Sequence, residues 1–296
     1  MPAADVARLL LLAGLWGGSF VFIRVAVAGL GPVWLAFSRV TLAFATLFVL
    51  ALVQRAVPPL RERWRDYLVV GTVNSALPFA LYAFAEQYLS ASTAAILNAT
   101  SPFFGALVAA FWLKESLSFR QLAGMGLGAG GVVVVVGWHP GPLSSSALVA
   151  TLACLGAALC YGIGGVYAKA RMSGVPSTAL ALYSQLAAAI ALVPLTAAAA
   201  LPAPPTPLIA VNVLALAIGS TAYAYRLYFR LIANVGPTRA LTVTFLIPLF
   251  GVVWGVALLG EPLTGNMLVG GVLILAGTGV ATRGSGGRRP REPARA

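Results

Sequence analysis

The fold is decided by a stretch of sequence that occurs twice. Residues 91–132 read ASTAAILNATSPFFGALVAAFWLKESLSFRQLAGMGLGAGGV, and residues 237–278 read PTRALTVTFLIPLFGVVWGVALLGEPLTGNMLVGGVLILAGT. A constant offset of 146 positions pairs Ala94 with Ala240, Pro102 with Pro248, Gly105 with Gly251, Glu115 with Glu261, Gly124 with Gly270, and Gly131 with Gly277. Two apolar helices can match by composition alone, but proline, glutamate and glycine at one fixed spacing indicate an internal duplication.

The composition places most of the chain in a lipid bilayer. Of 296 residues, 60% are hydrophobic and only 9% are charged, whereas soluble domains carry about a quarter of their residues as charged types. Ten apolar runs are long enough to cross a bilayer of ~30 Å, and they lie at 8–27, 32–53, 67–87, 92–113, 121–138, 147–168, 177–200, 208–229, 238–259 and 265–282. The sequence therefore predicts an all-α integral membrane protein of ten transmembrane helices.

The duplication divides these spans into two five-helix units. We expect the first repeat at 6–138, the second at 146–282, and a disordered basic cytoplasmic tail at 283–296. Because five is odd, the second unit enters the membrane in the opposite direction to the first. Secondary transporters use inverted repeats of this kind to obtain two alternative states from one architecture.

The basic residues predict the orientation. Of the 19 Lys and Arg residues, all but Arg24 and Arg39 fall on one side if the N-terminus is cytoplasmic. They are Arg8, Arg55, Arg61, Arg63, Arg65, Lys114, Arg120, Lys169, Arg171, Arg226, Arg230, Arg239, Arg283, Arg288, Arg289, Arg291 and Arg295. Cytoplasmic loops are enriched in basic residues. We therefore expect both termini in the cytoplasm of a multi-pass inner-membrane protein.

The sequence lacks the residue patterns that metal sites, cofactor sites and membrane enzymes require. The cysteines, Cys154 and Cys160, lie in one apolar run, and the single histidine, His139, lies in a loop. No metal site, cofactor or catalytic group is expected from this set, and no HExxH motif or clustered aspartate indicates a membrane enzyme. The net charge of +12 is placed in short gaps between spans, so we expect no nucleic-acid partner.

Three prolines within spans mark possible ligand groups. A polar residue lies four positions before each of them, in the pairs Asn74/Pro78, Asn98/Pro102 and Thr244/Pro248. Because proline has no N–H for the carbonyl four residues back, each polar residue carries a freed carbonyl oxygen. These groups suit a ligand with an ammonium or hydroxyl group, or the polar side chains repair the kink locally. Both interpretations remain open.

Further polar residues complete a predicted substrate site. We expect contacts from Asn98, Thr244, Tyr82, Tyr161, Asn74, Trp16, Ser220 and Arg39. Tyr and Trp can stack on a ligand, although they also occur as membrane-interface residues. Structural or gating roles are expected for Pro78, Pro102, Pro248, Glu115 and Glu261. No buried carboxylate is expected to bind protons, so export would be facilitated or coupled through another group.

Short motifs along the chain suggest a family. They are WGGSF at 16–20 with Arg24, Pro32 and Arg39, then Ala94, Pro102, Glu115, Gly124 and Gly131, and in the second copy Ala240, Pro248, Glu261, Gly270 and Gly277. With these motifs the chain resembles the EamA-type members of the drug/metabolite transporter superfamily over residues 6–282. One departure is Tyr161-Gly162-Ile163-Gly164 in place of a second WGGS. The resemblance implies ten helices, a central cavity and export of small metabolites, often amino acids.

The function predicted from these features is secondary transport. We expect export of amino acids or similar zwitterionic or neutral solutes across the inner membrane by alternating access. The alternatives are a lipid flippase or scramblase, and an exporter of other amphipathic drugs or metabolites. The expected partners are a small-molecule substrate and the lipid bilayer, with the protein acting as a monomer or a homodimer.

Overall fold

The protein is a bundle of helices. The computed structural model describes residues 1–60, 63–137 and 144–283, and those residues contain helices and no strand. The α-helices are α1 (Ala3–Val53), α2 (Trp64–Gly71), α3 (Leu77–Ala85), α4 (Ala91–Asn98), α5 (Ser101–Trp112), α6 (Phe119–Gly137), α7 (Ser145–Arg171), α8 (Ser177–Ala198), α9 (Pro207–Leu214), α10 (Ala224–Val235), α11 (Pro237–Ala240), α12 (Val243–Leu259) and α13 (Gly265–Arg283). Two π-helical segments are η1 (Thr72–Ala76) and η2 (Ala215–Tyr223).

Length and composition make most of these helices membrane spans. Eight continuous helical segments in the described ranges are long and apolar enough to cross a bilayer, and Val243–Leu259 is a shorter apolar helix. Large apolar side chains face outward on many of them, for example Val133, Val211 and Val272. Such surfaces need lipid around them. The prediction of a multi-pass inner-membrane protein is confirmed.

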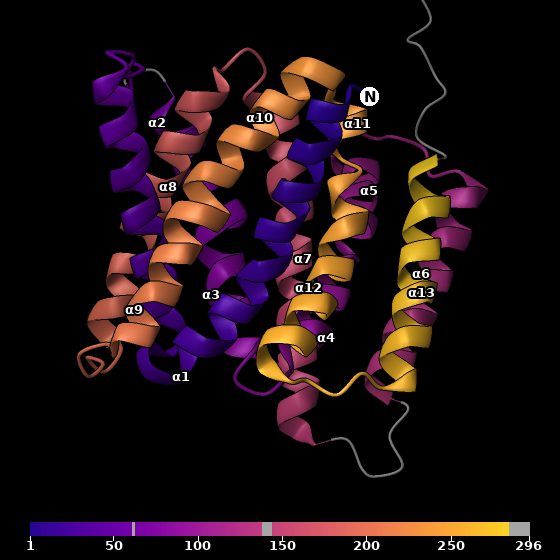
Figure 1. Cartoon of the computed structure of the whole chain (residues 1–296). Coiled ribbons are helices and arrows are strands. Elements are labelled where there is room, and N and C mark those ends of the chain that lie inside the picture. The colour runs from indigo at the N-terminus through magenta and orange to yellow at the C-terminus, as the bar shows by residue number, and fades with distance from the viewer. Residues whose placement is uncertain (61–62, 138–143, 284–296) are drawn as a thin grey trace, which may run out of the picture.

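Helix α1 is two helices joined at a glycine. Its 51 residues include Gly31 with a φ of +69° and a ψ of +167°, and Pro32 follows. A positive φ suits glycine, and proline supplies no N–H to continue the ladder. Figure 1 shows α1 running from the N-terminus to the opposite end of the bundle and then returning. The turn lies where the predicted span 8–27 gives way to the predicted span 32–53.

The three prolines distort their helices in different ways. Before Pro78 the chain forms the π-helical segment η1, and at Pro102 it breaks between α4 and α5. Pro248 lies inside α12, which begins only at Val243. Each proline removes one backbone hydrogen bond, and the neighbouring residues decide whether a bulge, a break or an early helix start absorbs the loss.

Helices α6 and α13 form a separate pair at one edge of the molecule (Figure 1). Glycines bring their backbones together: a Cβ on Gly124 would lie 2.5 Å from the Gly277 carbonyl oxygen, and one on Gly131 would lie 2.7 Å from that of Gly270. The 146-residue offset relates Gly124 to Gly270 and Gly131 to Gly277. The offset therefore maps the contact between Gly124 and Gly277 onto the contact between Gly270 and Gly131, so the two contacts are equivalent.

One predicted loop is largely helical. The gap expected at Arg230–Pro237 continues α10 to Val235, and Gly236, with a φ of +83°, ends the helix. The Asn234 side-chain amide donates a hydrogen bond of 2.8 Å to Asp5, which connects the end of α10 to the start of α1. The predicted tail 283–296 lies almost wholly outside the described residues, and so does His139.

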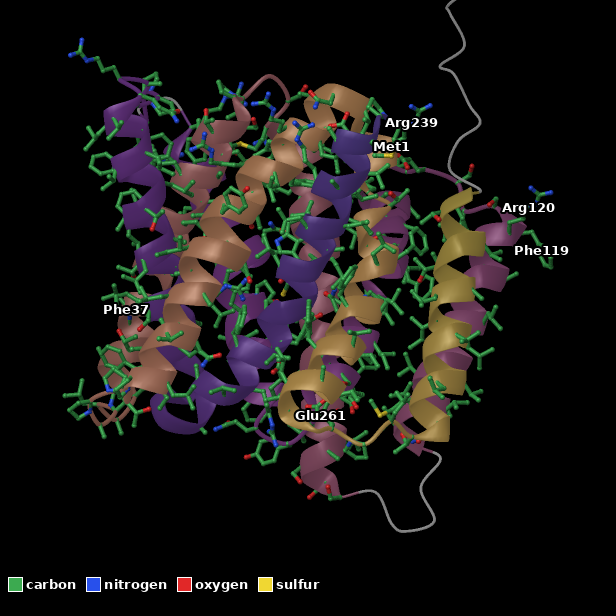
Figure 2. All side chains as sticks on the ribbon, viewed as in Figure 1. Met1, Phe37, Phe119, Arg120, Arg239 and Glu261 are labelled. Atoms are coloured by element: carbon green, nitrogen blue, oxygen red, sulfur yellow. The ribbon has the colours of Figure 1, made fainter. Side chains whose placement is uncertain are left out.

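The charged residues mark two ends of the bundle. Met1, Arg120 and Arg239 lie at one end, which we name the basic end, and Glu261 lies at the other, the Glu261 end (Figure 2). The basic segment before α2 contacts the basic C-terminus of α7, because the Arg63 guanidinium donates a hydrogen bond of 2.5 Å to the Arg171 carbonyl oxygen. Residues from distant basic loops therefore share one end.

Candidate functional site

Two tyrosines form the centre of the candidate site. The rings of Tyr82 in α3 and Tyr161 in α7 are stacked, with centroids 6.2 Å apart. The Tyr82 hydroxyl donates a hydrogen bond of 2.9 Å to Oδ1 of Asn98, at the end of α4. Phe20 of α1 packs its ring edge-on against Tyr82 at 5.5 Å. Three residues that the sequence predicted for the site are thus in direct contact.

A second aromatic pair mirrors the first. Trp16 of α1 packs against Tyr228 of α10, with ring centroids 5.3 Å apart. An offset of 146 relates Tyr82 to Tyr228, and one of 145 relates Trp16 to Tyr161. Each pair therefore joins the first helix of one predicted repeat to the third span of the other. Trp16 lies in this second pair and not beside Tyr82.

Arg39 is a buried cation beside these rings. Its Nε donates to Thr221 over 3.0 Å, and its guanidinium carbon lies 3.6 Å from the ring centroid of Phe79. Arg39 is only 6% exposed and lies within electrostatic range of Tyr161. Among the described residues no carboxylate forms an ion pair with it, and its terminal amino groups make no hydrogen bond. Arginine donors of this kind suit a carboxylate ligand.

The freed carbonyl oxygen of Asn98 and the Thr244 hydroxyl have local partners. The Ser101 hydroxyl donates to the Asn98 carbonyl oxygen over 2.7 Å, so the group freed by Pro102 is satisfied within the turn. The Thr244 hydroxyl donates to the Leu241 carbonyl oxygen over 2.8 Å. In the described ranges Thr244 has no hydrogen bond or ring contact with the Tyr82–Asn98 group. The Thr244 hydroxyl is thus engaged within its own turn, whereas the Asn98 side chain reaches Tyr82.

Two other predicted residues are engaged in helix packing. The Ser220 hydroxyl, 1% exposed, donates to the Leu15 carbonyl oxygen over 2.7 Å and joins η2 to α1. Asn74 lies against α7, where its Oδ1 is 2.9 Å from the position of a Cβ on Gly164. Both residues hold neighbouring helices together at the depth of the site.

Sequence reasoning missed a buried amide nearby. Gln185 of α8 is fully buried, and its Nε2 donates to Ser75 of η1 over 3.1 Å. Its Oε1 has no hydrogen-bond partner among the described residues. A polar residue in the middle of the span 177–200 was a signal that could have identified it. Nothing in the sequence indicated the π-helical segment that presents Ser75.

The two related glutamates make unequal contacts at opposite ends. At the Glu261 end, the Glu261 carboxylate accepts from the Ala91 amide (2.7 Å), the Ser92 amide (2.9 Å) and the Ser92 hydroxyl (2.5 Å). It thereby caps the N-terminus of α4. At the basic end, Glu115 forms a 3.0 Å ion pair with Lys169, and both side chains are more than half exposed. Exposed pairs stabilise by at most ~1 kcal/mol.

The expectation that no carboxylate is buried is wrong. Glu86, directly after α3, is fully buried, and neither of its carboxylate oxygens has a hydrogen-bond partner among the described residues. The Arg24 guanidinium donates to the backbone carbonyl of Glu86 instead. The Glu86 side chain lies inside the bundle, although Gln87 and Tyr88, the next two residues of the turn, are exposed.

Comparison with known proteins places the chain in a family. It is 28% identical to "Probable terminal-alkyne amino-acid exporter" of Streptantibioticus cattleyicolor, over 96% of this chain and 95% of that protein. It is 29% identical to "Probable amino-acid metabolite efflux pump" of Salmonella typhimurium, over 94% of each. A crystal structure with 20% identity covers 96% of this chain and 98% of its own, with a TM-score of 0.68, which shows a shared fold. The EamA-like transporter family model matches residues 6–137 and again 148–283, so the chain belongs to the EamA-like transporter family.

Proposed function

We propose that the protein exports amino acids or similar zwitterionic metabolites across the inner membrane by alternating access. The observation that carries this proposal is Arg39, a buried guanidinium with no carboxylate partner in the described structure, beside the Tyr161–Tyr82–Asn98 group. The names of the two relatives, both amino-acid exporters, support the same substrate class.

Each end of a zwitterion has a matching group in this arrangement. The substrate carboxylate would take the free N–H groups of Arg39, which can bind a carboxylate through two parallel hydrogen bonds. The ammonium group would donate to Oδ1 of Asn98 and lie against the faces of Tyr82 and Tyr161, which attract cations. Asn74, Trp16, Ser220 and Thr244 then belong to the surroundings of the site, through contacts between helices or a hydrogen bond within their own turn.

The proposed architecture is ten spans in two inverted repeats, at 6–138 and 146–282. The ten spans are the eight long helical segments, with α1 counted twice because it turns back at Gly31, and the shorter α12. The exchanged glycine contacts between α6 and α13 support a pseudo-twofold relation, as do the two aromatic pairs. In the orientation that the basic residues predict, with both termini in the cytoplasm, the basic end is cytoplasmic and the Glu261 end faces outside.

Alternating access would move the first two spans of each repeat against the third and fourth. Such motion has to open one end of the bundle while closing the other. The contact between Arg24 of the first span and the Glu86 carbonyl oxygen, near the Glu261 end, and the exposed Glu115–Lys169 pair at the other end each join the two groups and are candidate closures. Helices α6 and α13 pack mainly on each other and would stay at the periphery.

Counterflow in liposomes tests this function. Purified protein is reconstituted with an unlabelled amino acid inside, and uptake of the labelled amino acid is measured across a panel of side chains. Saturable counterflow that needs both the ammonium and the carboxylate group supports the proposal. Equilibration of labelled lipid between leaflets, without amino-acid counterflow, would instead identify a lipid flippase or scramblase.

A further inference from the structure

Glu86 has chemistry that the proposed transport site does not use. It is one of two buried acidic residues in the described ranges, and the other, Asp5, is bonded to Arg8 and Asn234. Both carboxylate oxygens of Glu86 are inaccessible to water and have no hydrogen-bond partner in the part of the chain that the structure describes. A bare carboxylate in such a place costs several kcal/mol. The usual outcome for an unpaired buried carboxyl group is to bind a proton and become neutral.

The surroundings of Glu86 offer no compensating contact. The charged or titratable groups within electrostatic reach are Arg24 and Arg39 of α1, Tyr82 of α3, Cys154 of α7, and Glu261 after α12. Arg24 donates to the Glu86 backbone carbonyl and Arg39 to Thr221. Glu261 carries the same sign of charge as an ionised Glu86 and is itself held by α4. The proton-bound form is therefore the one that fits this arrangement.

The position of Glu86 links its proton to the closure of one end. Glu86 begins the turn between α3 and α4, and α4 starts at Ala91, whose amide is bonded to Glu261. The same carboxylate holds Ser92. If the Glu261 end opens, the first span separates from the third and fourth, the contact between Arg24 and the Glu86 carbonyl oxygen is broken, and the Glu86 carboxyl group meets water. In water the carboxyl group would ionise at neutral pH.

We propose that Glu86 is a proton-binding site, neutral while the Glu261 end is closed and deprotonated to the outside medium when that end opens. The proposal rests on the alternating access described above. One proton is released in each opening and taken up in each closing. Because one proton is exchanged, the equilibrium between closed and open forms changes by up to about tenfold per pH unit. A higher outside pH favours the open form.

Cysteine labelling tests this site without any substrate. In a background with Cys154→Ala and Cys160→Ala, the reporter is Ala91→Cys, at a position that is fully buried in the closed form. A second protein carries Pro204→Cys, at an exposed loop position, and corrects for the pH dependence of the maleimide reaction itself. The rate of labelling by an impermeant maleimide is measured from about pH 5 to about pH 9 in each protein.

The variants at position 86 decide the outcome. With Glu86 present, labelling at position 91 relative to position 204 should rise by up to about tenfold per pH unit over its titration range. Glu86→Gln, which stays neutral, should label slowly and without this rise, while Glu86→Asp should restore a pH-dependent rise. Glu115→Gln, a matched change at the basic end, should keep the dependence. A flat profile with Glu86 intact overturns the proposal without any variant, and so does a rise that persists in Glu86→Gln.

The labelling experiment tests the proton site and the counterflow experiment tests the proposed function, so each proposal can be refuted independently of the other. A pH-dependent opening at Glu86 in a protein without amino-acid counterflow would leave the proton site in place and refute the proposed function. Saturable counterflow together with a flat labelling profile would support the proposed function and refute the proton site.

Discussion

Gly17 of α1 and Gly251 of α12 lie in backbone contact: a Cβ on Gly17 would be 2.8 Å from the Gly251 amide nitrogen. Gly162 of α7 meets Gly105 of α5 in the same way, with a corresponding distance of 2.7 Å. Offsets of 145 and 146 relate Gly17 to Gly162 and Gly105 to Gly251. The first span of each predicted repeat therefore crosses the fourth span of the other at a pair of glycines, which allow close approach in membranes.

We predict that Gly17→Ala destabilises the protein. The added Cβ would lie 2.7–2.9 Å from atoms of Ile247, Phe250 and Gly251, two of them backbone atoms, so α1 and α12 must separate. Overpacking of this kind costs about 1–3 kcal/mol. The control is Gly14→Ala, one turn earlier, where the nearest atom is 3.8 Å away. Thermal unfolding in detergent should show a lower midpoint for Gly17→Ala only. Equal midpoints would mean that the glycine contact has no energetic role.

We predict that Tyr82 and Asn98 act as a unit in substrate binding. Tyr82→Phe removes the hydroxyl that donates to Asn98, and Asn98→Ala removes the acceptor. Leaving a ligand group or the Tyr82 hydroxyl unpaired costs about 1–3 kcal/mol, so Asn98→Ala should weaken apparent affinity about 5- to 150-fold. The double variant should be weaker by less than the product of the single effects. Counterflow at varied substrate concentration measures all three, and unchanged affinity in Asn98→Ala would contradict the proposed site.

We predict that Arg39 binds the substrate carboxylate. Replacing it with Gln removes the charge, so apparent affinity for an amino acid should fall about 10- to 150-fold, as expected for hydrogen bonds to charged groups. The corresponding amino-acid amide, which has no carboxylate, should bind wild-type protein and Arg39→Gln equally. Arg39→Lys keeps a charge but not the paired N–H donors, and should lie between them. Competition in the counterflow assay measures these affinities, and equal losses for acid and amide would assign Arg39 a purely structural role.

We predict the orientation from the basic residues. In the background without native cysteines, Pro204→Cys should react with an impermeant maleimide in intact cells, because this loop joins α8 to α9 at the end away from the basic loops. Ser173→Cys, after Arg171, should react only after permeabilisation. Both positions are exposed, so burial does not limit either reaction. Labelling of Ser173→Cys in intact cells would reverse the orientation.

The sequence by itself determined the membrane class and the positions of the bends. Apolar runs must lie in lipid whatever their neighbours are, because transfer from water depends on the residues of the run. The turn of α1 at Gly31 and Pro32 was predictable for the same reason, since a missing N–H and a positive φ are local properties. The family assignment also followed from motifs along the chain.

Only the tertiary structure decided which polar groups meet. Tyr82 was a candidate from sequence, but its contacts with Tyr161 and Asn98 join α3, α7 and the end of α4. Glu86 lies at the end of a predicted span, and its side chain is fully buried although the next two residues, Gln87 and Tyr88, are exposed. Burial and pairing depend on residues far apart in the chain, and no local pattern carries that information. Thr244 illustrates the converse, because its hydroxyl bonds within its own turn and stays apart from the site.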